Sequence, residues 1–482
     1  MTKKQLLNNK EISYYGLPND VSGISIDSRK VNKGDIFFLL EKKPSVAIKY
    51  INQAIDKGAA AVILSSTFNN KNIKNIIPII KVDSVRKELS FISSRFFPNQ
   101  PKTIAAITGT NGKTSVAKFT EQIWEQSGIP SASIGTLGNS KIKLDSTLTT
   151  PDPISLHKQL NQLAIRDCNN VIIEASSHGL DQHRIDNIKL SGAAFVSFSR
   201  DHLDYHKNMQ QYLNTKKRLF LELIKEDSTV VMNLLGIQKR YHSFINDIQS
   251  KRLITIGKSH STINILEVSR SIDKKINLKI NIDDKLLNIE TPFFALFQSI
   301  NAVIAACVSS IDSRVSLIDS LMDLVSLKDI TGRLEFVASK DKYIDIYVDY
   351  AHTPSAMKSV LESLRLITKN NLILVFGAGG DRDKGKRKLM RDIAKYFANL
   401  VIVTDDNPRY EDPKNIRDQL MIDTDNFIEI PDRFEAIKYA ITKLKRGDNL
   451  IICGKGHEDY MLYKDAKIFF SDQQAVKTIL NL

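Results

Sequence analysis

Residues 105–119, AAITGTNGKTSVAKF, join an apolar run to a helical pattern through a glycine-rich turn. Backbone N–H groups in such a turn, and at the start of the helix that follows, bind phosphate oxygens. The turn is shorter than the usual G-x-x-x-x-G-K-[ST] loop, because Ile107 stands where the first glycine belongs. Lys113 suits the β- and γ-phosphates of ATP, and the Thr114 hydroxyl suits Mg²⁺. The predicted phosphate loop comprises Gly109, Thr110, Asn111, Gly112, Lys113, Thr114 and Ser115.

Carboxylate and imidazole groups follow two later apolar runs. Glu174 ends the run NNVIIEAS, and a carboxylate opposite a phosphate loop can hold Mg²⁺. His202 is the first histidine after the run AAFVSFS, and we expect it to contact a second Mg²⁺. For His206 the sequence leaves a structural role and a site role equally open.

The elements that position these residues alternate between apolar strands and helical patterns, which indicates parallel α/β sheets. Ligands bind at the carboxyl ends of such strands. We expect strands within 34–40 and 58–64, a helix at 47–58 and a linker at 96–101. A chain of 482 residues suits about three domains. The predicted α/β domains are an N-terminal domain (1–98), a central P-loop parallel-sheet ATPase domain (99–331) and a C-terminal doubly wound Rossmann-like domain (332–482).

Composition narrows the functional class. The chain is 42% hydrophobic and 25% charged, as in soluble globular proteins, and it has no run of roughly 18 apolar residues. The net charge is +14, but the lysines are spread along the whole chain, so we expect no nucleic-acid partner. Residues 1–16 lack the apolar core of a leader peptide. Cys168, Cys307 and Cys453 match no metal pattern and are expected to be reduced. The sequence predicts a cytoplasmic monomer without membrane insertion.

Nine motifs occur in an order that resembles the Mur ligase family, the ATP-dependent amino-acid ligases of peptidoglycan synthesis. They are GTNGKTS, TTPDP, EASSHGLDQHR, SRDHLDYH, TGR, VDYAHTP, FGAGGDRDKGKR, TDDNPR and GKGHEDY. Residues 27–38, DSRKVNKGDIFF, resemble the uridine-binding segment of the branch that adds the third peptide residue. The resemblance spans most of the chain.

The resemblance implies a reaction and a set of residues for it. ATP would phosphorylate the D-glutamyl carboxylate of UDP-N-acetylmuramoyl-L-alanyl-D-glutamate, and an amine would attack the acyl phosphate. The implied catalytic residues are Lys113, Glu174, His202 and Lys216. The implied Mg²⁺ ligands are Thr114, Glu174, His202 and Lys216 as a carbamate. Asn301 and Arg333 would contact the nucleotide, and Asp349 and His352 are weaker candidates. Substrate contacts would come from Ser28, Thr149, Thr150, Ser176, Gln182 and Arg184.

The tetrapeptide Asp406-Asn407-Pro408-Arg409 bears on the incoming amino acid. In the family, DNPR accompanies meso-diaminopimelate, whose distal carboxylate an arginine fork can bind through two hydrogen bonds. L-lysine has no carboxylate there, so Arg409 would oppose its ammonium. Arg382, Gly454 and Glu458 match the rest of this pocket, and Glu458 would accept hydrogen bonds from the distal ammonium.

Departures from the family pattern and rival functions remain open. Lys43, Pro44 and Ser45 replace the usual uridine-side loop, and Ala295 and Gln298 replace a glycine and an asparagine. The same ligase could use L-lysine. Folylpolyglutamate synthase and the ligase of the terminal dipeptide share the architecture, but DSR and DNPR argue against both. A P-loop NTPase without ligase activity would leave TTPDP and the C-terminal pocket without purpose. An inactive binding protein would not need Lys113, Glu174 and His202.

Overall fold

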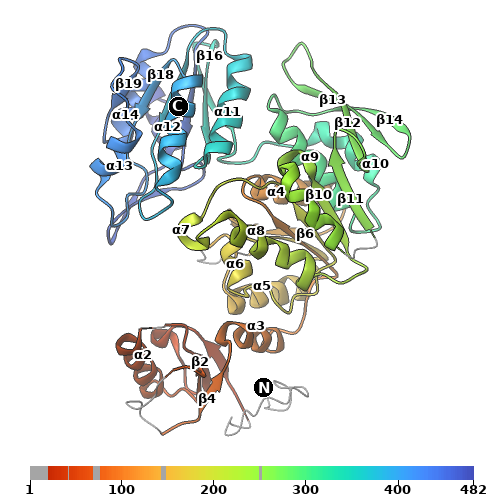
Figure 1. Ribbon diagram of the computed structural model, residues 1–482, viewed down its shortest axis with the longest axis vertical. Helices are drawn as coiled ribbons and strands as arrows, with labels where there is room; N and C mark the ends of the chain where they lie inside the picture. The colour runs from red at the N-terminus through yellow and green to blue at the C-terminus, as the bar shows by residue number, and fades with distance from the viewer. Residues whose placement is uncertain (1–19, 42, 69–75, 143–147, 249–251) are drawn as a thin grey trace.

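Three separate sheets, each mainly parallel, organise the chain in the computed structural model (Figure 1). The structure describes residues 20–41, 43–68, 76–142, 148–248 and 252–482. The predicted α/β fold with three domains is confirmed. The expectation about a leader peptide in 1–16 lies outside the described residues. Within the described ranges, no helix is both long and apolar enough to cross a membrane.

The N-terminal domain is a four-stranded parallel sheet in the order β1-β2-β3-β4. Phe37 packs towards helix α2 and Phe38 towards helix α3, as the alternation of side chains along a strand requires. The elements are β1 (Gly23–Ser25), η1 (Ser28–Lys30), β2 (Asp35–Phe38), α2 (Pro44–Asp56), β3 (Ala61–Ser65), β4 (Ile79–Val82) and α3 (Val85–Phe96). The linker predicted at 96–101 follows α3 and leads into the central domain.

The central sheet has the order β14-β13-β12-β11-β10-β9-β5-β8-β6-β7. Ile107 of β5 packs with helices α4 and α9 on one face, and Ile104 packs with α5 and α8 on the other. Its strands are β5 (Thr103–Thr108), β6 (Ser131–Gly135), β7 (Gly138–Asn139), β8 (Asn170–Glu174), β9 (Gly192–Phe195), β10 (Thr229–Asn233), β11 (Arg252–Gly257), β12 (Ile263–Arg270), β13 (Ile276–Ile282) and β14 (Lys285–Glu290). Its longer helices are α4 (Lys113–Gln126), α5 (Pro153–Ile165), α8 (Met209–Arg218) and α9 (Leu296–Ser309). Short helical segments are α6 (Ser177–Asp181), α7 (Leu203–His206), η2 (Leu219–Leu223), η3 (Leu234–Gly236), η4 (Lys239–Asp247), α10 (Leu317–Met322) and η5 (Asp323–Ser326).

Strands β12 to β14 differ from the expected alternation of strands and helices, because they follow one another and pair antiparallel. Every second residue of β13 from Ile276 to Ile282 is buried, the pattern of a strand with one solvated face. Asp283 and Asp284 form the two-residue turn into β14, and both have positive φ, as tight hairpin turns require. This arm projects at the upper right of Figure 1.

The C-terminal domain has a six-stranded sheet in the order β15-β16-β20-β17-β18-β19, parallel except for β15. Leu374 packs towards helices α11 and α12, and Ile373 and Val375 pack towards α14 and α15. The strands are β15 (Glu335–Lys340), β16 (Ile344–Asp349), β17 (Leu372–Phe376), β18 (Leu400–Val403), β19 (Phe427–Glu429), β20 (Asn449–Cys453) and the hairpin β21 (Tyr460–Tyr463) with β22 (Ala466–Phe469). The helices are α11 (Pro354–Ile367), α12 (Gly385–Phe397), α13 (Pro413–Leu420), α14 (Arg433–Lys443) and α15 (Asp472–Leu480). Helices on both faces make this domain doubly wound.

Candidate active site

The predicted phosphate loop lies between β5 and α4, at the carboxyl edge of the central sheet. Gly112 precedes α4 with φ of 87°, a conformation that favours glycine. A Cβ there would stand 2.7 Å from Val196 Cγ1 and 2.8 Å from Asn301 Oδ1, so the loop also needs glycine for close packing. The Lys113 amine donates to the carbonyls of Gly109 at 2.8 Å and Thr110 at 2.9 Å. Lys113 is thus folded back over its own loop.

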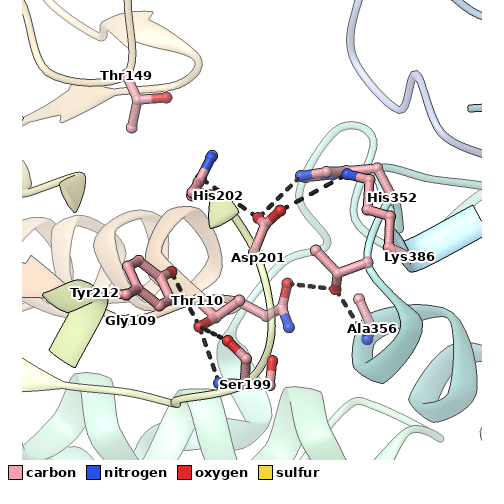
Figure 2. A network of polar contacts seen from close by, with 12 residues as sticks. Gly109, Thr110, Thr149, Ser199, Asp201, His202, Tyr212, His352, Ala356 and Lys386 are labelled. Carbon is pink, nitrogen blue, oxygen red and sulfur yellow. Dashed lines mark hydrogen bonds and ion pairs between the residues drawn. The ribbon is translucent and has the colours of Figure 1, made fainter. Parts of the chain in front are cut away.

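The loop is hydrogen-bonded both within the central domain and to the C-terminal domain across the cleft. Thr110 Oγ1 donates to the carbonyl of Ser199 at 3.1 Å within the central domain. Asn111 Nδ2 donates to Ser355 Oγ at 2.9 Å, and its Oδ1 accepts from Thr353 Oγ1 at 3.1 Å. Thr353 caps α11, so the phosphate loop contacts the C-terminal domain directly. Figure 2 shows the Thr110–Ser199 contact beneath Asp201.

Glu174 is buried at the end of β8, beside the loop. Its Oε2 accepts from Thr114 Oγ1 at 3.0 Å and from Thr136 Oγ1 at 3.0 Å, and its Oε1 accepts from Thr136 N at 2.8 Å. The structure therefore brings together the carboxylate and the hydroxyl that the sequence assigns to Mg²⁺. Those are oxygen donors of the kind that Mg²⁺ prefers.

Lys216 of α8 is almost completely buried at the same edge. Its Nζ donates to the Gly109 carbonyl at 3.0 Å and to Thr108 Oγ1 at 3.3 Å, and it lies 4.6 Å from the centroid of the Tyr212 ring. Burial, with Lys113 adding to the effect, lowers the pKa of Lys216 well below its usual value. Its neighbour Lys217 instead lies over Phe244. Of these two adjacent lysines, the one that the resemblance implies, Lys216, lies against the phosphate loop.

Asp201 is a site residue that the sequence analysis did not single out. Its buried carboxylate faces His202 Nε2 at 3.4 Å, Lys386 Nζ at 3.7 Å and His352 Nε2 at 3.9 Å (Figure 2). Burial lowers the pKa of His202 to about 3 and that of His352 to about 4, so both rings are neutral at neutral pH. Lys386 is then the cation that faces Asp201. The motif SRDH places an acid directly before the predicted histidine, which is the one signal that pointed to it.

The sequence left the roles of His206 and His352 open, and of the two only His352 lines the cleft. His352 Nδ1 donates to the Tyr350 carbonyl at 2.7 Å, and the side chain lines the cleft. His206 is buried, and its Nε2 has no hydrogen-bond partner among the described residues. Its ring lies 5.7 Å from that of His178 and 5.2 Å from that of Tyr212. His206 thus packs with His178 and Tyr212, the rings that also contact His202.

The predicted nucleotide contacts Asn301 and Arg333 are linked by a residue that departs from the family pattern. Gln298 Oε1 accepts from Asn301 Nδ2 at 3.1 Å, and Gln298 Nε2 donates to the Arg333 carbonyl at 3.1 Å. Arg333 Nη2 also donates to Thr114 Oγ1 at 3.1 Å, and its guanidinium covers the Tyr350 ring at 4.5 Å. Asparagine would be one methylene shorter, so the replacement extends the bridge between the two domains.

Asp349, the other weaker candidate, lies at the end of β16 and lines the cleft. Its carboxylate accepts from the backbone N–H groups of Leu334 and Ala351, each at 2.6 Å. Burial raises its pKa to about 6, against the opposing effect of Arg333. Asp349 therefore fixes the backbone that carries Arg333.

The predicted substrate contacts form one hydrogen-bonded group near Glu174, with one exception. Thr150 Oγ1 donates to the Glu174 carbonyl at 2.7 Å and lies 2.9 Å from Ser176 Oγ. Arg184 donates to the Thr150 carbonyl at 2.7 Å and to Gln182 Oε1 at 2.8 Å. Arg86 of the N-terminal domain donates to the same Gln182 oxygen at 3.0 Å. The exception is Ser28, which belongs to the N-terminal domain and bonds Gln53 at 2.7 Å.

The DNPR segment follows β18 and meets the β20 end of the same sheet. Asn407 Nδ2 donates to Glu458 Oε2 at 2.8 Å, and the buried Lys455 amine approaches the same oxygen at 3.3 Å. Burial and the neighbouring Asp406 raise the pKa of Glu458. Arg409 uses Nη1 to bond the carbonyls of Gly380 at 2.9 Å and Asn407 at 3.3 Å. Among the described residues, nothing bonds its Nε and Nη2.

A single cleft of about 1860 Å³ joins these groups across the central and C-terminal domains. Its lining includes the predicted residues Thr110, Asn111, Gly112, Lys113, Thr114, Ser115, Thr149, Glu174, Ser176, Arg184, His202, Asn301, Arg333, Arg382, Asp406, Asn407, Arg409, Gly454 and Glu458. Of the other predicted residues, Lys216 bonds the Gly109 carbonyl of the loop, Thr150 bonds the Glu174 carbonyl and Gln182 bonds Arg184, whereas Pro408 and Ser28 are not among the residues that line the cleft. The groups predicted to bind phosphate and those predicted to bind the distal carboxylate thus share one space.

Known proteins match this chain along nearly its whole length. Residues 107–309 match the Mur ligase middle domain, and residues 332–456 match the Mur ligase, glutamate ligase domain. A UDP-N-acetylmuramoyl-L-alanyl-D-glutamate--2,6-diaminopimelate ligase of Chelativorans sp. (strain BNC1) is 39% identical over 463 residues, covering 95% of each chain. The ligase of the same name from Rickettsia bellii (strain RML369-C) is 38% identical over 466 residues, again covering 95% of each chain.

Solved structures give the same result for the fold. A ligase structure of that same name covers 100% of this chain and 99% of its own, with 29% identity and a TM-score of 0.69. The MurF ligase of Thermotoga maritima in complex with ADP covers 90% of this chain and 94% of its own, with 16% identity and a TM-score of 0.60. The second likeness shows the fold alone. On the relatives and the two matched domains, the chain belongs to the Mur ligase family.

Proposed function

We propose that this protein is an ATP-dependent, ADP-forming ligase that joins meso-diaminopimelate to UDP-N-acetylmuramoyl-L-alanyl-D-glutamate. One observation carries the proposal: the phosphate loop and the Arg409–Glu458 pocket open into the same cleft. A ligase of this type needs the activated carboxylate and the incoming amine in one space. The names of the relatives from Chelativorans and Rickettsia point to the same reaction.

Each domain takes one partner in this proposal. Residues 1–98 would hold the UDP end, residues 99–331 ATP and Mg²⁺, and residues 332–482 the amino acid. Ser28, as the uridine-side contact, would have to exchange its bond to Gln53 for one to the ligand. Arg86 links the predicted uridine-side domain to the predicted muramoyl contacts of the central domain, because it bonds Gln182 beside them.

The residues beside the loop fit Mg²⁺. Thr114 and Glu174 place a hydroxyl and a carboxylate 3.0 Å apart, and His202 is neutral at neutral pH, the form that binds metals. Lys216 would complete the set as a carbamate. Its lowered pKa favours the neutral amine, which can attack the carbon of CO₂ and lose one proton, giving the anion. Bound Mg²⁺ would offset the negative charge of the phosphates.

The chain's own groups then act on ATP and the D-glutamyl carboxylate. Lys113 would turn from the Gly109 and Thr110 carbonyls to the γ-phosphate and neutralise charge as phosphoryl transfer proceeds. The carboxylate oxygen attacks the γ-phosphorus, ADP leaves, and an acyl phosphate forms. The amine of the incoming amino acid attacks the acyl carbon, and the tetrahedral intermediate expels phosphate.

The C-terminal pocket selects the incoming amino acid. Arg409 would bind the distal carboxylate of meso-diaminopimelate through Nε and Nη2, the two nitrogens without partners among the described residues. Arg382 lines the same part of the cleft. Glu458 Oε2 is already bonded by Asn407 and Lys455, so its Oε1 would receive the distal ammonium. L-lysine would meet the Arg409 guanidinium without a carboxylate to pair with it.

An assay of ADP release and product mass tests the proposal. The protein would receive ATP and Mg²⁺, with or without the UDP-muramoyl dipeptide, and with meso-diaminopimelate, L-lysine or no amino acid. Tripeptide and stoichiometric ADP with meso-diaminopimelate are expected. Tripeptide with L-lysine instead would keep the ligase and overturn the amino-acid assignment. ADP release that depends on neither amino acid nor dipeptide, without product, would indicate a P-loop NTPase.

A further inference from the structure

Arg200 and Asp383 form an ion pair across the boundary between the central and C-terminal domains. Arg200 Nε donates to Asp383 Oδ2 at 2.9 Å, and Nη2 donates to Oδ1 at 3.0 Å. The Asp383 carboxylate is 7% exposed, and its Oδ1 also accepts from the Gly385 backbone N–H at 2.9 Å. Two parallel bonds between charged groups give both strength and a defined orientation.

Gly385, the first residue of α12, makes room for this pair. A Cβ at position 385 would stand 2.3 Å from Arg200 Nη2 and 3.1 Å from its Cζ. A real Cβ atom does not approach another heavy atom so closely, so any side chain there would displace the guanidinium. Gly385 therefore leaves the space that the Arg200 guanidinium occupies.

The neighbouring residues repeat the pairing with opposite signs. Asp201, directly after Arg200, faces Lys386, directly after Gly385, with 3.7 Å between Oδ1 and Nζ. Asp201 and Lys386 are both buried. Each domain thus contributes one cation and one anion: Arg200 and Asp201 are adjacent in the central domain, and Asp383 and Lys386 are three residues apart in the C-terminal domain. A shift of one domain against the other would break both.

The two paired segments carry residues that the proposed reaction needs on opposite sides of the cleft. Arg382 precedes Asp383 directly, and His202 follows Asp201 directly. Arg382 also acts electrostatically across the boundary: after burial, it is the largest contribution that lowers the pKa of His178 on α6. The loop of Arg382 is therefore held facing the central domain.

We propose that Arg200 and Asp383, admitted by Gly385, are positioning residues that fix the amino-acid pocket against the phosphate-transfer site. The inference rests on the proposed function, in which Arg382 binds meso-diaminopimelate. The pair sets the distance between the amine of that substrate and the acyl phosphate. Neither residue need touch a reacting atom.

Charge reversal tests the proposal in the full-length protein. Arg200→Asp and Asp383→Arg are each expected to raise KM for meso-diaminopimelate about two- to fivefold, the range for a partly exposed ion pair with good geometry. KM for ATP should stay near that of the wild type, because the phosphate loop keeps its bonds to Thr353 and Ser355. The double variant Arg200→Asp/Asp383→Arg restores opposite charges, and its KM for meso-diaminopimelate should fall back towards the wild-type value.

Gly385→Ala supplies a second variant that keeps both charges. It should also raise KM for meso-diaminopimelate, since it displaces the Arg200 guanidinium. Lys414→Ala is the matched control, because Lys414 pairs with Asp418 on the exposed face of α13 and does not cross the boundary. Thermal unfolding of every variant shows which of them fold.

Two outcomes would overturn the inference. One is an unchanged KM for meso-diaminopimelate in both Gly385→Ala and the folded charge variants. The other is an equal rise in KM for both substrates without recovery in the double variant, which would indicate general loosening. Failure of the proposed function is a separate result, since the wild-type protein would then make no tripeptide at all.

Discussion

The Lys216 amine lies 3.0 Å from the carbonyl oxygen of Gly109, so a buried lysine is in contact with the first residue of the phosphate loop. The amine has no carboxylate as a hydrogen-bonding partner among the described residues, and burial lowers its pKa well below the usual value. Structural lysines rarely occupy such a position, because burying an unpaired charge is costly. The placement is explained if the amine is neutral and reacts with CO₂.

Replacing Lys216 with methionine separates a catalytic role from a structural one. Methionine fills a similar volume but loses the bonds to Gly109 and Thr108, so the free energy of unfolding should stay within about 1 kcal/mol of wild type. Ligation should fall by at least about a hundredfold, because the carbamate cannot form. Calorimetry measures the stability, and the assay of ADP release and product mass measures ligation. Full activity in Lys216→Met would rule out the carbamate.

Glu174→Gln should impair Mg²⁺-dependent activity strongly while changing the stability of the fold little. The amide keeps the shape of the side chain near Thr114 and Thr136 but removes the charge. We expect kcat to fall about a hundredfold and the Mg²⁺ concentration for half-maximal rate to rise. Glu125→Gln is the matched control, since Glu125 pairs with Lys141 on the surface end of α4. An unchanged Mg²⁺ dependence in Glu174→Gln would contradict the assignment.

The pH dependence of stability should come in part from His157, which is far from the reacting groups. Burial lowers its pKa from 6.5 to about 4. The unfolded chain therefore takes up a proton on this ring below pH 6.5, whereas the folded protein does not until about pH 4. Stability falls as pH drops through that window, by about 2 kcal/mol at pH 5 for this residue alone.

His157→Gln removes this contribution. Urea unfolding of the ligand-free protein at pH 7.5 and pH 5 should show a smaller loss of stability in the variant than in the wild type. The same change at the exposed His260 is the control. An equal loss in wild type and His157→Gln would mean that the ring is protonated in the folded protein.

Much of the site could be predicted from the sequence because its residues stand at strand ends. Glu174 and His202 follow apolar runs, and parallel strands bring such ends to one edge of a sheet. The phosphate loop has a local signature that depends only on its own glycines. Amino-acid selection depended on resemblance, since DNPR alone is an ordinary turn sequence. For these residues, local pattern and three-dimensional placement agree.

The rest depended on contacts between distant segments. Only docking of the C-terminal domain places Lys386 and His352 against Asp201. Gln298 is a departure from the family pattern whose bridging of Asn301 and Arg333 appears only in three dimensions. The antiparallel arm β12–β14 was missed because short apolar runs do not reveal strand direction; the Asp283–Asp284 turn was its local signal.

The measurement that tests the account most directly is a competition between meso-diaminopimelate and L-lysine for the same activated dipeptide. Mass spectrometry would count the two tripeptides made by the wild-type protein and by Arg409→Lys. Wild type should make the meso-diaminopimelate product almost alone. Arg409→Lys keeps the charge but loses the fork, so its kcat/KM for meso-diaminopimelate should fall about ten- to a hundredfold. Preference for L-lysine in the wild type, or an unchanged preference in Arg409→Lys, would contradict the account.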